Sequence, residues 1–314
     1  MKAFYIKSYG GPEASVYGEL PDPVAVKDQL LVEVKAVSIN PVDFKLKRGN
    51  LKLMTGSKFP KIMGSDFAGV VKSAGSNVTG FKAGDRVYGV TPVIFRKLGA
   101  LAQLLAVDQK YARIIPREMS FEEAASLPIA ALTALNGLRK CRVGPGFRVL
   151  VNGGTGGVGH FGIQIAKAKG AVVTATCSTG NAELARKLGA DETVGYSSDE
   201  LAKINSQFDA ILDAYGWMDY ADVCRLLKRK GIYASTQFKP GKFFSALMVR
   251  IVFRKKLTSS NLRSRPEDMS EMEGLFLDKK IIPLIENYYT LDKSFEAFEF
   301  AEHGKPRGKI IVRI

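Results

Sequence analysis

The chain has 314 residues, of which 46% are hydrophobic and 25% charged, values typical of a folded globular protein. No apolar run approaches the roughly 18 residues needed to span a bilayer. The first six residues lack the apolar core of a secretory signal, so we expect a cytoplasmic protein. Three scattered cysteines and two histidines argue against a disulfide framework and against a transition-metal site.

The formal net charge of +15 is concentrated in one part of the chain. Residues 223–266 contain twelve Lys and Arg and no Asp or Glu. Such a stretch forms either an ordinary solvated face or a surface that attracts phosphates, nucleic acid or anionic lipid. The sequence leaves both interpretations open.

The first 115 residues have the pattern of short strands separated by turns. Residues 30–37 and 67–71 are rich in β-branched side chains, and a Gly-rich turn at 80–84 leads into a third strand. Strands this closely spaced predict a compact, barrel-like β domain.

Helix and strand signals alternate after residue 116. We expect a helix over 121–140 with Ser120 as its N-cap. The strands that follow are predicted at 148–151, 171–176, 208–212 and 231–235, with helices at 160–169, 181–188 and 219–228. This alternation predicts parallel strands joined by crossover helices, the doubly wound α/β class.

The last part of the chain again has a mixed pattern, with helices expected at 266–278 and 292–303 and a final strand at 309–314. We expect that final strand to complete the first domain. The predicted division is therefore residues 1–116 with 262–314 as one domain and residues 117–261 as the other.

A glycine-rich loop follows the strand at 148–151. Gly154, Gly156 and Gly159 form G-x-G-x-x-G between a predicted strand and a predicted helix, the context in which this motif binds a dinucleotide. The helix N-terminus then faces the pyrophosphate. The expected cofactor-binding residues of this loop are Gly154, Thr155, Gly156, Gly157, Val158 and Gly159. A tight turn without a ligand is the alternative.

The residues at the end of the next strand indicate whether NAD or NADP is the preferred cofactor. NAD-binding folds usually place an acid at its end to bind the ribose 2′-hydroxyl. Here residues 176–181 read Thr-Cys-Ser-Thr-Gly-Asn, without an acid. Hydroxyl and amide groups tolerate a 2′-phosphate, so the sequence favours NADPH.

Eight short motifs resemble, in order, the zinc-free quinone oxidoreductase branch of the medium-chain dehydrogenase/reductase superfamily. They lie at residues 9–12, 38–43, 64–71, 84–87, 124–128, 156–160, 187–191 and 308–312. The resemblance covers essentially the whole chain. It implies an α/β protein with a GroES-like β-barrel-type catalytic domain and a doubly wound Rossmann domain, with NADPH in the cleft between them.

Two residues distinguish this chain from the zinc alcohol dehydrogenases it also resembles. Asn40 and Ser65 stand where those enzymes carry the Cys and His that ligate zinc. Alkoxide activation on zinc is therefore disfavoured. The resemblance implies hydride transfer from NADPH to a small hydrophobic acceptor that is already electron-poor, a quinone or an α,β-unsaturated carbonyl.

The resemblance also implies roles for individual residues. Asn40 is expected near the nicotinamide and substrate, with a turn-forming role before Pro41 as the alternative. Tyr215 is a candidate proton donor or stacking residue, although water could protonate the product instead. We expect Asp43 to be structural, and Lys309 to be a solvated lysine rather than a cofactor ligand.

Four further residues match positions near the cofactor. Thr133 matches a position beside the carboxamide, with core packing as an equal alternative. Ser178, Asn181 and Tyr196 match positions at the adenosine 2′-phosphate. Gly180 departs from the pattern, because relatives often carry Arg or Lys there, and this weakens the preference for NADPH.

The segment 242–256 mixes large apolar residues with Arg and Lys. It resembles a family segment near the acceptor pocket, but also fits a contact in a homodimer or an interfacial helix on anionic lipid. No specific nucleic acid is predicted as a partner. Two alternative functions stay open: a weakly catalytic NADPH-binding protein whose basic face binds membrane or RNA, and a pathway-specific reductase of acyl-type or lipid-derived enones.

Overall fold

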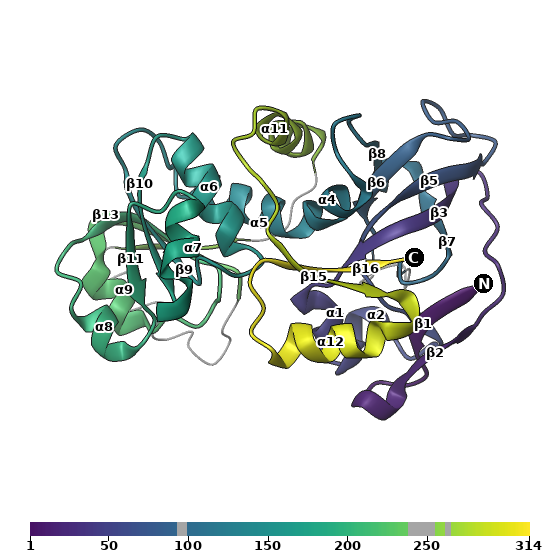
Figure 1. Cartoon of the computed structure of the whole chain (residues 1–314), viewed down its shortest axis with the longest axis horizontal. Helices are drawn as coiled ribbons and strands as arrows, with labels where there is room; N and C mark the ends of the chain where they lie inside the picture. Colours follow the sequence, from purple (N-terminus) through teal and green to yellow (C-terminus); the bar gives the residue numbers. More distant parts are fainter. Residues whose placement is uncertain (93–98, 238–254, 261–264) are drawn as a thin grey trace. The chain divides into compact units, whose positions relative to one another are not determined.

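The computed structural model describes residues 1–92, 99–237, 255–260 and 265–314. The chain divides into two compact units, one of Met1–Ile129 with Ile285–Ile314 and one of Ala130–Leu284 (Figure 1). The observed boundaries between the units, 129/130 and 284/285, both lie later in the chain than the expected boundaries, 116/117 and 261/262. The α/β fold with a β-rich unit and a doubly wound unit is the predicted one.

The first unit is built on two sheets. A three-stranded sheet has the order β2-β1-β4, and a seven-stranded sheet has the order β15-β16-β3-β5-β6-β8 with β7 also pairing with β3. The strands are β1 (Lys2–Ile6), β2 (Ser15–Glu19), β3 (Gln29–Ser38), β4 (Lys61–Ile62), β5 (Asp66–Ala74), β6 (Arg86–Val90), β7 (Leu104–Asp108), β8 (Ala112–Ile114), β15 (Ile285–Thr290) and β16 (Lys309–Arg313). The helices are α1 (Pro41–Lys47), α2 (Lys52–Thr55), α4 (Phe121–Ser126), α12 (Ser294–His303) and the 3₁₀ turns η1 (Pro12–Ala14), η2 (Gln109–Tyr111) and η5 (Leu291–Lys293).

The C-terminal strand completes this unit, as the sequence predicted. β16 lies between β15, which is parallel to it, and β3, which is antiparallel, with Ile311 opposite Ser38. The apolar side chains of these strands form one core with those of α12, where the rings of Phe4 and Phe298 lie 5.3 Å apart. This pairing brings the start of β16 beside the end of β3.

The second unit holds a six-stranded parallel sheet with the order β11-β10-β9-β12-β13-β14. Its strands are β9 (Arg148–Asn152), β10 (Val172–Cys177), β11 (Glu192–Gly195), β12 (Phe208–Asp213), β13 (Leu227–Ser235) and β14 (Lys256–Ser259). The helices are α5 (Pro128–Lys140), α6 (Gly159–Ala168), α7 (Ala182–Lys187), α8 (Ser198–Ala202), α9 (Tyr220–Leu226), α11 (Pro266–Leu277) and η3 (Thr179–Asn181). In Figure 1, α6 and α7 lie against this sheet.

Two predicted helices are shorter than the sequence suggested. The helix expected over 121–140 is divided at Leu127, because Pro128 has no backbone N–H and starts α5. Ser120 caps α4, with Glu123 completing a capping box. The helix expected over 219–228 ends at Leu226, where the chain turns directly into β13.

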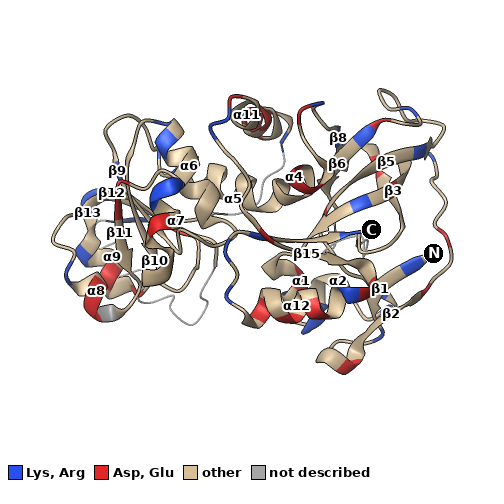
Figure 2. Cartoon of the chain, in the orientation of Figure 1, with Lys and Arg blue, Asp and Glu red and all other residues tan. Residues whose placement is uncertain are grey.

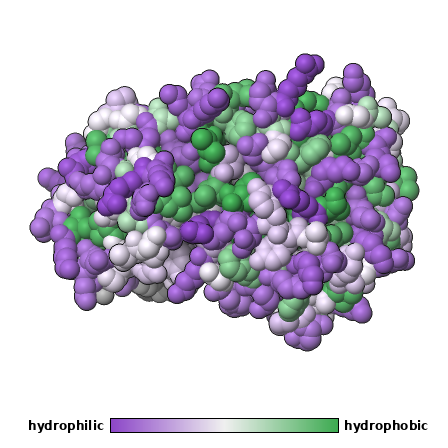
Figure 3. Space-filling model, in the orientation of Figure 1, coloured by the Kyte–Doolittle hydropathy of each residue, from purple (hydrophilic) through white to green (hydrophobic). Residues whose placement is uncertain are grey.

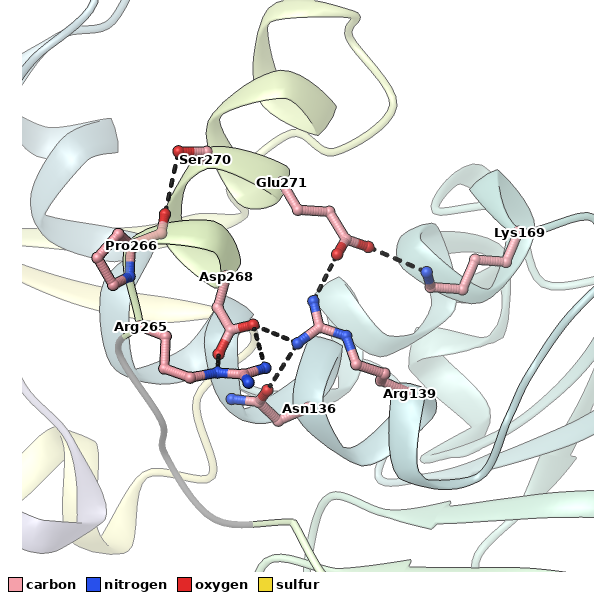
Figure 4. A network of polar contacts seen from close by, with 8 residues as sticks. All are labelled: Asn136, Arg139, Lys169, Arg265, Pro266, Asp268, Ser270 and Glu271. Carbon is pink, nitrogen blue, oxygen red and sulfur yellow. Dashed lines mark hydrogen bonds and ion pairs between the residues drawn. The ribbon is translucent and has the colours of Figure 1, made fainter.

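Ion pairs hold α11 within the second unit. Arg139 of α5 pairs with Asp268 and Glu271, and Glu271 also accepts a hydrogen bond from Lys169 Nζ at 3.0 Å (Figure 4). Arg265 contacts both oxygens of the same Asp268 carboxylate, and Asp268 is fully buried. These contacts place α11 with the parallel sheet, although its sequence lies beyond the expected boundary of that domain.

Charged residues are spread over both units (Figure 2), and hydrophilic side chains cover most of the face shown in Figure 3.

The predicted basic stretch, residues 223–266, lies partly outside the described residues, and so does almost all of the segment 242–256. In the parts of the chain that the structure describes, no helix is both long and apolar enough to cross a bilayer.

Candidate active site

The glycine-rich loop joins the end of β9 to the start of α6. Gly153 has a φ of +78°, a conformation that favours glycine. A Cβ on Gly154 would lie 2.8 Å from the Cβ of Ala175, and one on Gly159 would lie 2.0 Å from the Gly153 carbonyl oxygen. These two glycines are therefore required by close packing.

Gly156 differs from the other two glycines of the motif. In the described parts of the chain, a Cβ there would meet one atom within 4 Å, the Gly153 carbonyl oxygen at 3.4 Å. The space beside Gly156 is therefore open to a ligand, at the N-terminal end of a ten-residue helix. This arrangement fits the pyrophosphate of a dinucleotide, which would be held by backbone N–H groups and the positive end of the helix dipole.

The predicted 2′-phosphate residues gather at the ends of β10 and β11. Cys177 pairs with Gly195 in the parallel ladder, so Ser178 and Tyr196 are the next residues on two adjacent strands. Asn181 donates to the Thr155 hydroxyl over 3.4 Å, which links this edge to the glycine loop. Burial raises the pKa of the adjacent Cys177 thiol, so it stays neutral.

Tyr215 lies at the same sheet edge, and Thr133 on α5 contacts the residue that follows β14 at that edge. Tyr215 follows β12 and is 67% exposed, and a Cβ on Gly153 would lie 3.2 Å from its Cβ. Thr133 is buried on α5, and its backbone carbonyl accepts a hydrogen bond from Ser260 Oγ at 2.5 Å. The structure thus brings Tyr215 to the glycine loop, and the proposed contact of Thr133 stays a prediction.

Asn40 is the centre of a buried polar cluster in the first unit. It ends the turn between β3 and α1, and its Nδ2 donates to Asp66 Oδ2 at 2.9 Å, Ser38 O at 3.1 Å and Ser65 Oγ at 3.2 Å. Its Oδ1 accepts from Lys309 Nζ at 2.6 Å. Both the nitrogen and the oxygen of the Asn40 amide therefore already have hydrogen-bond partners within the protein. The catalytic role of Asn40 stays a prediction.

The expectation that Lys309 is solvated is wrong. Lys309 is 3% exposed, because β16 starts beside the end of β3 and directs this side chain into the Asn40 cluster. Burial lowers the pKa of Lys309, while the carboxyl groups of Asp66 and Asp43 act to raise it. The ammonium and the two carboxyl groups thus form a buried charge cluster.

Asp43 has the structural role that the sequence predicted. Its Oδ2 accepts from the Asn40 backbone N–H at 2.8 Å and from Ser65 Oγ at 3.2 Å, which closes a capping box at the start of α1. Complete burial raises the pKa of Asp43 to about 7 against the opposing effect of these hydrogen bonds and of Lys309. Burial also raises the pKa of Asp66, to which the backbone N–H of Ile129 donates over 3.2 Å.

These residues do not suit a zinc ion. Asn40, Ser65 and Lys309 offer an amide, a hydroxyl and an ammonium rather than the thiolate and imidazole groups that zinc prefers, and an ammonium repels a divalent cation. The described residues contain one other cluster of metal-binding groups, Glu299, Glu302 and His303. Its Glu302 is already paired with Lys47 at 3.5 Å and Arg48 at 2.6 Å.

Sequence reasoning assigned no functional role to three residues that the structure makes central. Asp66 was visible in the Gly-Ser-Asp motif, and Lys309 in the closing Gly-Lys-Ile-Ile-Val strand, where we expected it to be solvated. Asp213 was visible as the residue that follows the strand predicted at 208–212. In each case the signal was a polar residue at one end of an apolar strand, but several of its partners come from distant segments.

The comparisons with known proteins agree with this architecture. A family profile of the alcohol dehydrogenase GroES-like domain matches residues 26–117, and one of zinc-binding dehydrogenases matches residues 188–312. The chain is 32% identical to a chloroplast envelope quinone oxidoreductase homolog of Arabidopsis thaliana, over 99% of this chain and 98% of the relative.

A second relative is the chloroplastic NADPH-dependent alkenal/one oxidoreductase of Arabidopsis thaliana, also 32% identical, over 99% of this chain and 79% of the relative. The solved quinone oxidoreductase of Coxiella burnetii superposes with a TM-score of 0.90 at 30% identity, over 100% of this chain and 99% of the other. The chain therefore belongs to the quinone oxidoreductase branch of the medium-chain dehydrogenase/reductase superfamily and is an oxidoreductase that uses a nicotinamide cofactor.

Proposed function

We propose that the protein transfers a hydride from NADPH to a quinone or an α,β-unsaturated carbonyl without a metal ion. The observation that carries this proposal is the Asn40–Lys309 contact, which puts an ammonium on Asn40, a residue that the resemblance matches to a zinc ligand of the alcohol dehydrogenases. Without a Lewis acid to activate an alcohol, the acceptor itself must be electron-poor. The names of the two Arabidopsis relatives point to the same two acceptor classes.

The choice of NADPH rests on the edge formed by Ser178, Asn181 and Tyr196. Residues 178–181 carry no acid that would repel a 2′-phosphate. Tyr196 is 57% exposed and is the next residue after the paired end of β11. One relative is itself named as NADPH-dependent.

In this proposal the chain binds and orients, and the bound cofactor supplies the hydride. The backbone at Gly156 and the start of α6 hold the pyrophosphate. Tyr215, beside the glycine loop, stacks on the acceptor or donates a proton to its reduced product. Asn40 and Lys309 keep a fixed, buried arrangement of charge within the first unit.

The test follows the absorbance of reduced nicotinamide in the presence of a planar ortho-quinone or a medium-chain alkenal. NADH is compared with NADPH, and both reactions are repeated after dialysis against a metal chelator. Turnover with NADPH that survives the chelator supports the proposal. Tight binding of NADPH without turnover of either acceptor class would overturn it in favour of a binding role, and loss of activity in chelator would overturn the metal-free mechanism.

We propose further that the protein works as a homodimer in the cytoplasm. The support is the family resemblance, since relatives of this branch are commonly dimers. Light scattering of the purified protein measures the mass directly, and a monomer would contradict the proposal. Salt-sensitive binding to anionic vesicles tests the proposed membrane contact through residues 223–266.

A further inference from the structure

Asp213 occupies the point where the strand order of the parallel sheet reverses. It is the last residue of β12, which lies beside β9, and the chain continues from these two strands toward opposite edges of the sheet. Such a point is where doubly wound sheets bind their ligands. The side chain of Asp213 is fully buried at this end of the sheet.

Four neutral donors converge on its carboxylate. Oδ1 accepts from Asn152 Nδ2 at 2.7 Å and from Gly216 N at 2.8 Å, and Oδ2 accepts from Met218 N at 3.1 Å and Tyr233 Oη at 2.6 Å. Burial and the Asp213 carboxylate raise the pKa of Tyr233, which keeps its hydroxyl a donor. A carboxylate suits this position because both oxygens can accept two hydrogen bonds.

One of these donors connects Asp213 to the glycine loop. Asn152, the last residue of β9, also accepts from Thr176 Oγ1 at 2.6 Å through its Oδ1. The same Thr176 hydroxyl accepts from the Gly153 backbone N–H at 2.9 Å, and the Thr176 carbonyl accepts from Gly154 N at 2.8 Å. A continuous series of hydrogen bonds therefore runs from the glycine loop to Asp213.

Two other donors belong to the loop of residues 214–218, which carries Tyr215 and Trp217. Both side chains are exposed, at 67% and 62%. Gly216 has a φ of +82°, and a Cβ there would lie 2.1 Å from Gln237 Cγ, so the backbone path of this loop is narrowly defined. The loop also abuts the glycine loop directly, through the close approach of Gly153 to Tyr215.

We propose that Asp213 is a positioning residue for the nicotinamide dinucleotide, joining the glycine loop and the 214–218 loop into one preformed wall of its binding site. Its carboxylate bonds to both loops, through Asn152 on one side and through Gly216 and Met218 on the other. Fixing both loops before binding removes the cost of ordering them when the cofactor arrives. The inference rests on the proposed function, because it assumes that the cofactor binds at the glycine loop.

The test replaces Asp213 by Asn and measures cofactor affinity. An amide must turn its NH₂ group toward one of the two pairs of donors, and each pair includes a backbone N–H of the 214–218 loop, so D213N loses a contact to that loop in either orientation. Trp217 is the only tryptophan of the chain, and its fluorescence reports NADPH binding from within the 214–218 loop. We expect the Kd and the KM for NADPH to rise at least about tenfold, the factor that one lost charge-assisted hydrogen bond produces, with a smaller change in kcat.

Y233F is the matched control. Tyr233 donates to the same carboxylate but belongs to neither loop, and its ring packs in the core against Tyr220. We expect Y233F to lower the melting temperature while its NADPH Kd stays within about twofold of the original chain. If D213N and Y233F lose the same stability and both keep their affinity, Asp213 is merely structural and the inference is wrong.

A second variant keeps the test decisive if D213N does not fold. N152A cuts the connection between Asp213 and Thr176 without changing a buried charge, and it should raise the NADPH Kd as well. Unchanged affinity in N152A would overturn the inference. Failure of the cofactor assignment on which the inference rests has a different signature, because the unmodified chain would then bind neither NADPH nor NADH.

Discussion

The side-chain oxygen of Asn40 lies 2.6 Å from the ammonium nitrogen of Lys309, a residue 269 positions later in the chain. The contact joins the start of α1 to the start of β16 and lies among the buried carboxyl groups of Asp43 and Asp66. The two carboxyl groups favour the Lys309 ammonium, whereas Asp43 and Asp66 disfavour ionisation of one another, so the charge state of each group depends on the other two.

Replacing Lys309 by Met should strongly destabilise the protein. The change keeps most of the side-chain volume but removes the hydrogen bond from the Lys309 ammonium to Asn40 Oδ1, and the loss of a buried hydrogen bond from a charged group costs about 1.5–3 kcal/mol. Urea unfolding measures the loss. Lys293→Met is the control, since Lys293 makes an exposed ion pair with Glu296 and its loss should change stability little. Equal effects of the two variants would contradict the prediction.

Asp43 should make the stability depend on pH in a defined direction. Because burial raises its pKa to about 7, the folded chain retains a proton that the unfolded chain releases near pH 4. The stabilising contribution of the protonated carboxyl is therefore complete below about pH 4 and is lost as the pH rises through 7. Asp43→Asn cannot lose this proton, so its stability relative to the original chain should increase over that range.

Unfolding free energies measured at intervals between pH 4 and pH 8 test this dependence. The difference between Asp43→Asn and the original chain should change by up to about 1.4 kcal/mol per pH unit in the middle of the range. Asp278→Asn, which removes an exposed carboxyl group, provides the control. A difference that does not vary with pH would show that Asp43 titrates normally.

Two glycine variants should separate binding from folding. Gly156→Ala places a methyl group in open space where the pyrophosphate is proposed to lie, so NADPH affinity should fall about tenfold or more while the melting temperature stays nearly constant. Gly159→Ala forces a methyl group against the Gly153 carbonyl and should destabilise the fold. Titration calorimetry and thermal unfolding measure both. Unaltered affinity in Gly156→Ala would place the cofactor elsewhere.

Gly180→Arg should increase the preference for NADPH. Among the described residues, a Cβ at this position would meet nothing within 4 Å, so an Arg side chain has room there to reach a 2′-phosphate. The ratio of kcat/KM for NADPH to that for NADH should rise several-fold, mainly through a lower KM for NADPH. Gly180→Gln, which is long but uncharged, is the control. An equal gain with NADH would mean that the 2′-phosphate lies away from this edge.

The sequence predicted the local elements of the cofactor unit well. Alternating apolar strands and helices set the positions of β9, β10 and β12, and the glycines that pack tightly at 154 and 159 could be identified from their spacing. The two helices that ended early did so at Pro128 and at Leu227, where backbone chemistry and strand pairing overrode the Ala- and Leu-rich pattern.

The polar clusters around Lys309 and Asp213 could not be predicted from the sequence. Lys309 begins a strand with the apolar pattern of a sheet edge, and nothing near it in sequence shows that its ammonium will be buried. Asp213 likewise gains two of its donors, Asn152 and Tyr233, from strands that only the order β9-β12-β13 brings to its sides.

By itself, the sequence determined the two-part α/β architecture, the glycine loop and the absence of zinc-ligating side chains at positions 40 and 65, because these depend on local pattern and residue type. Only the tertiary structure decided that Lys309 reaches Asn40 and that Asp213 joins two loops. Contacts of this kind are set by which strands become neighbours in a sheet, and that order is a property of the whole folded chain rather than of any segment.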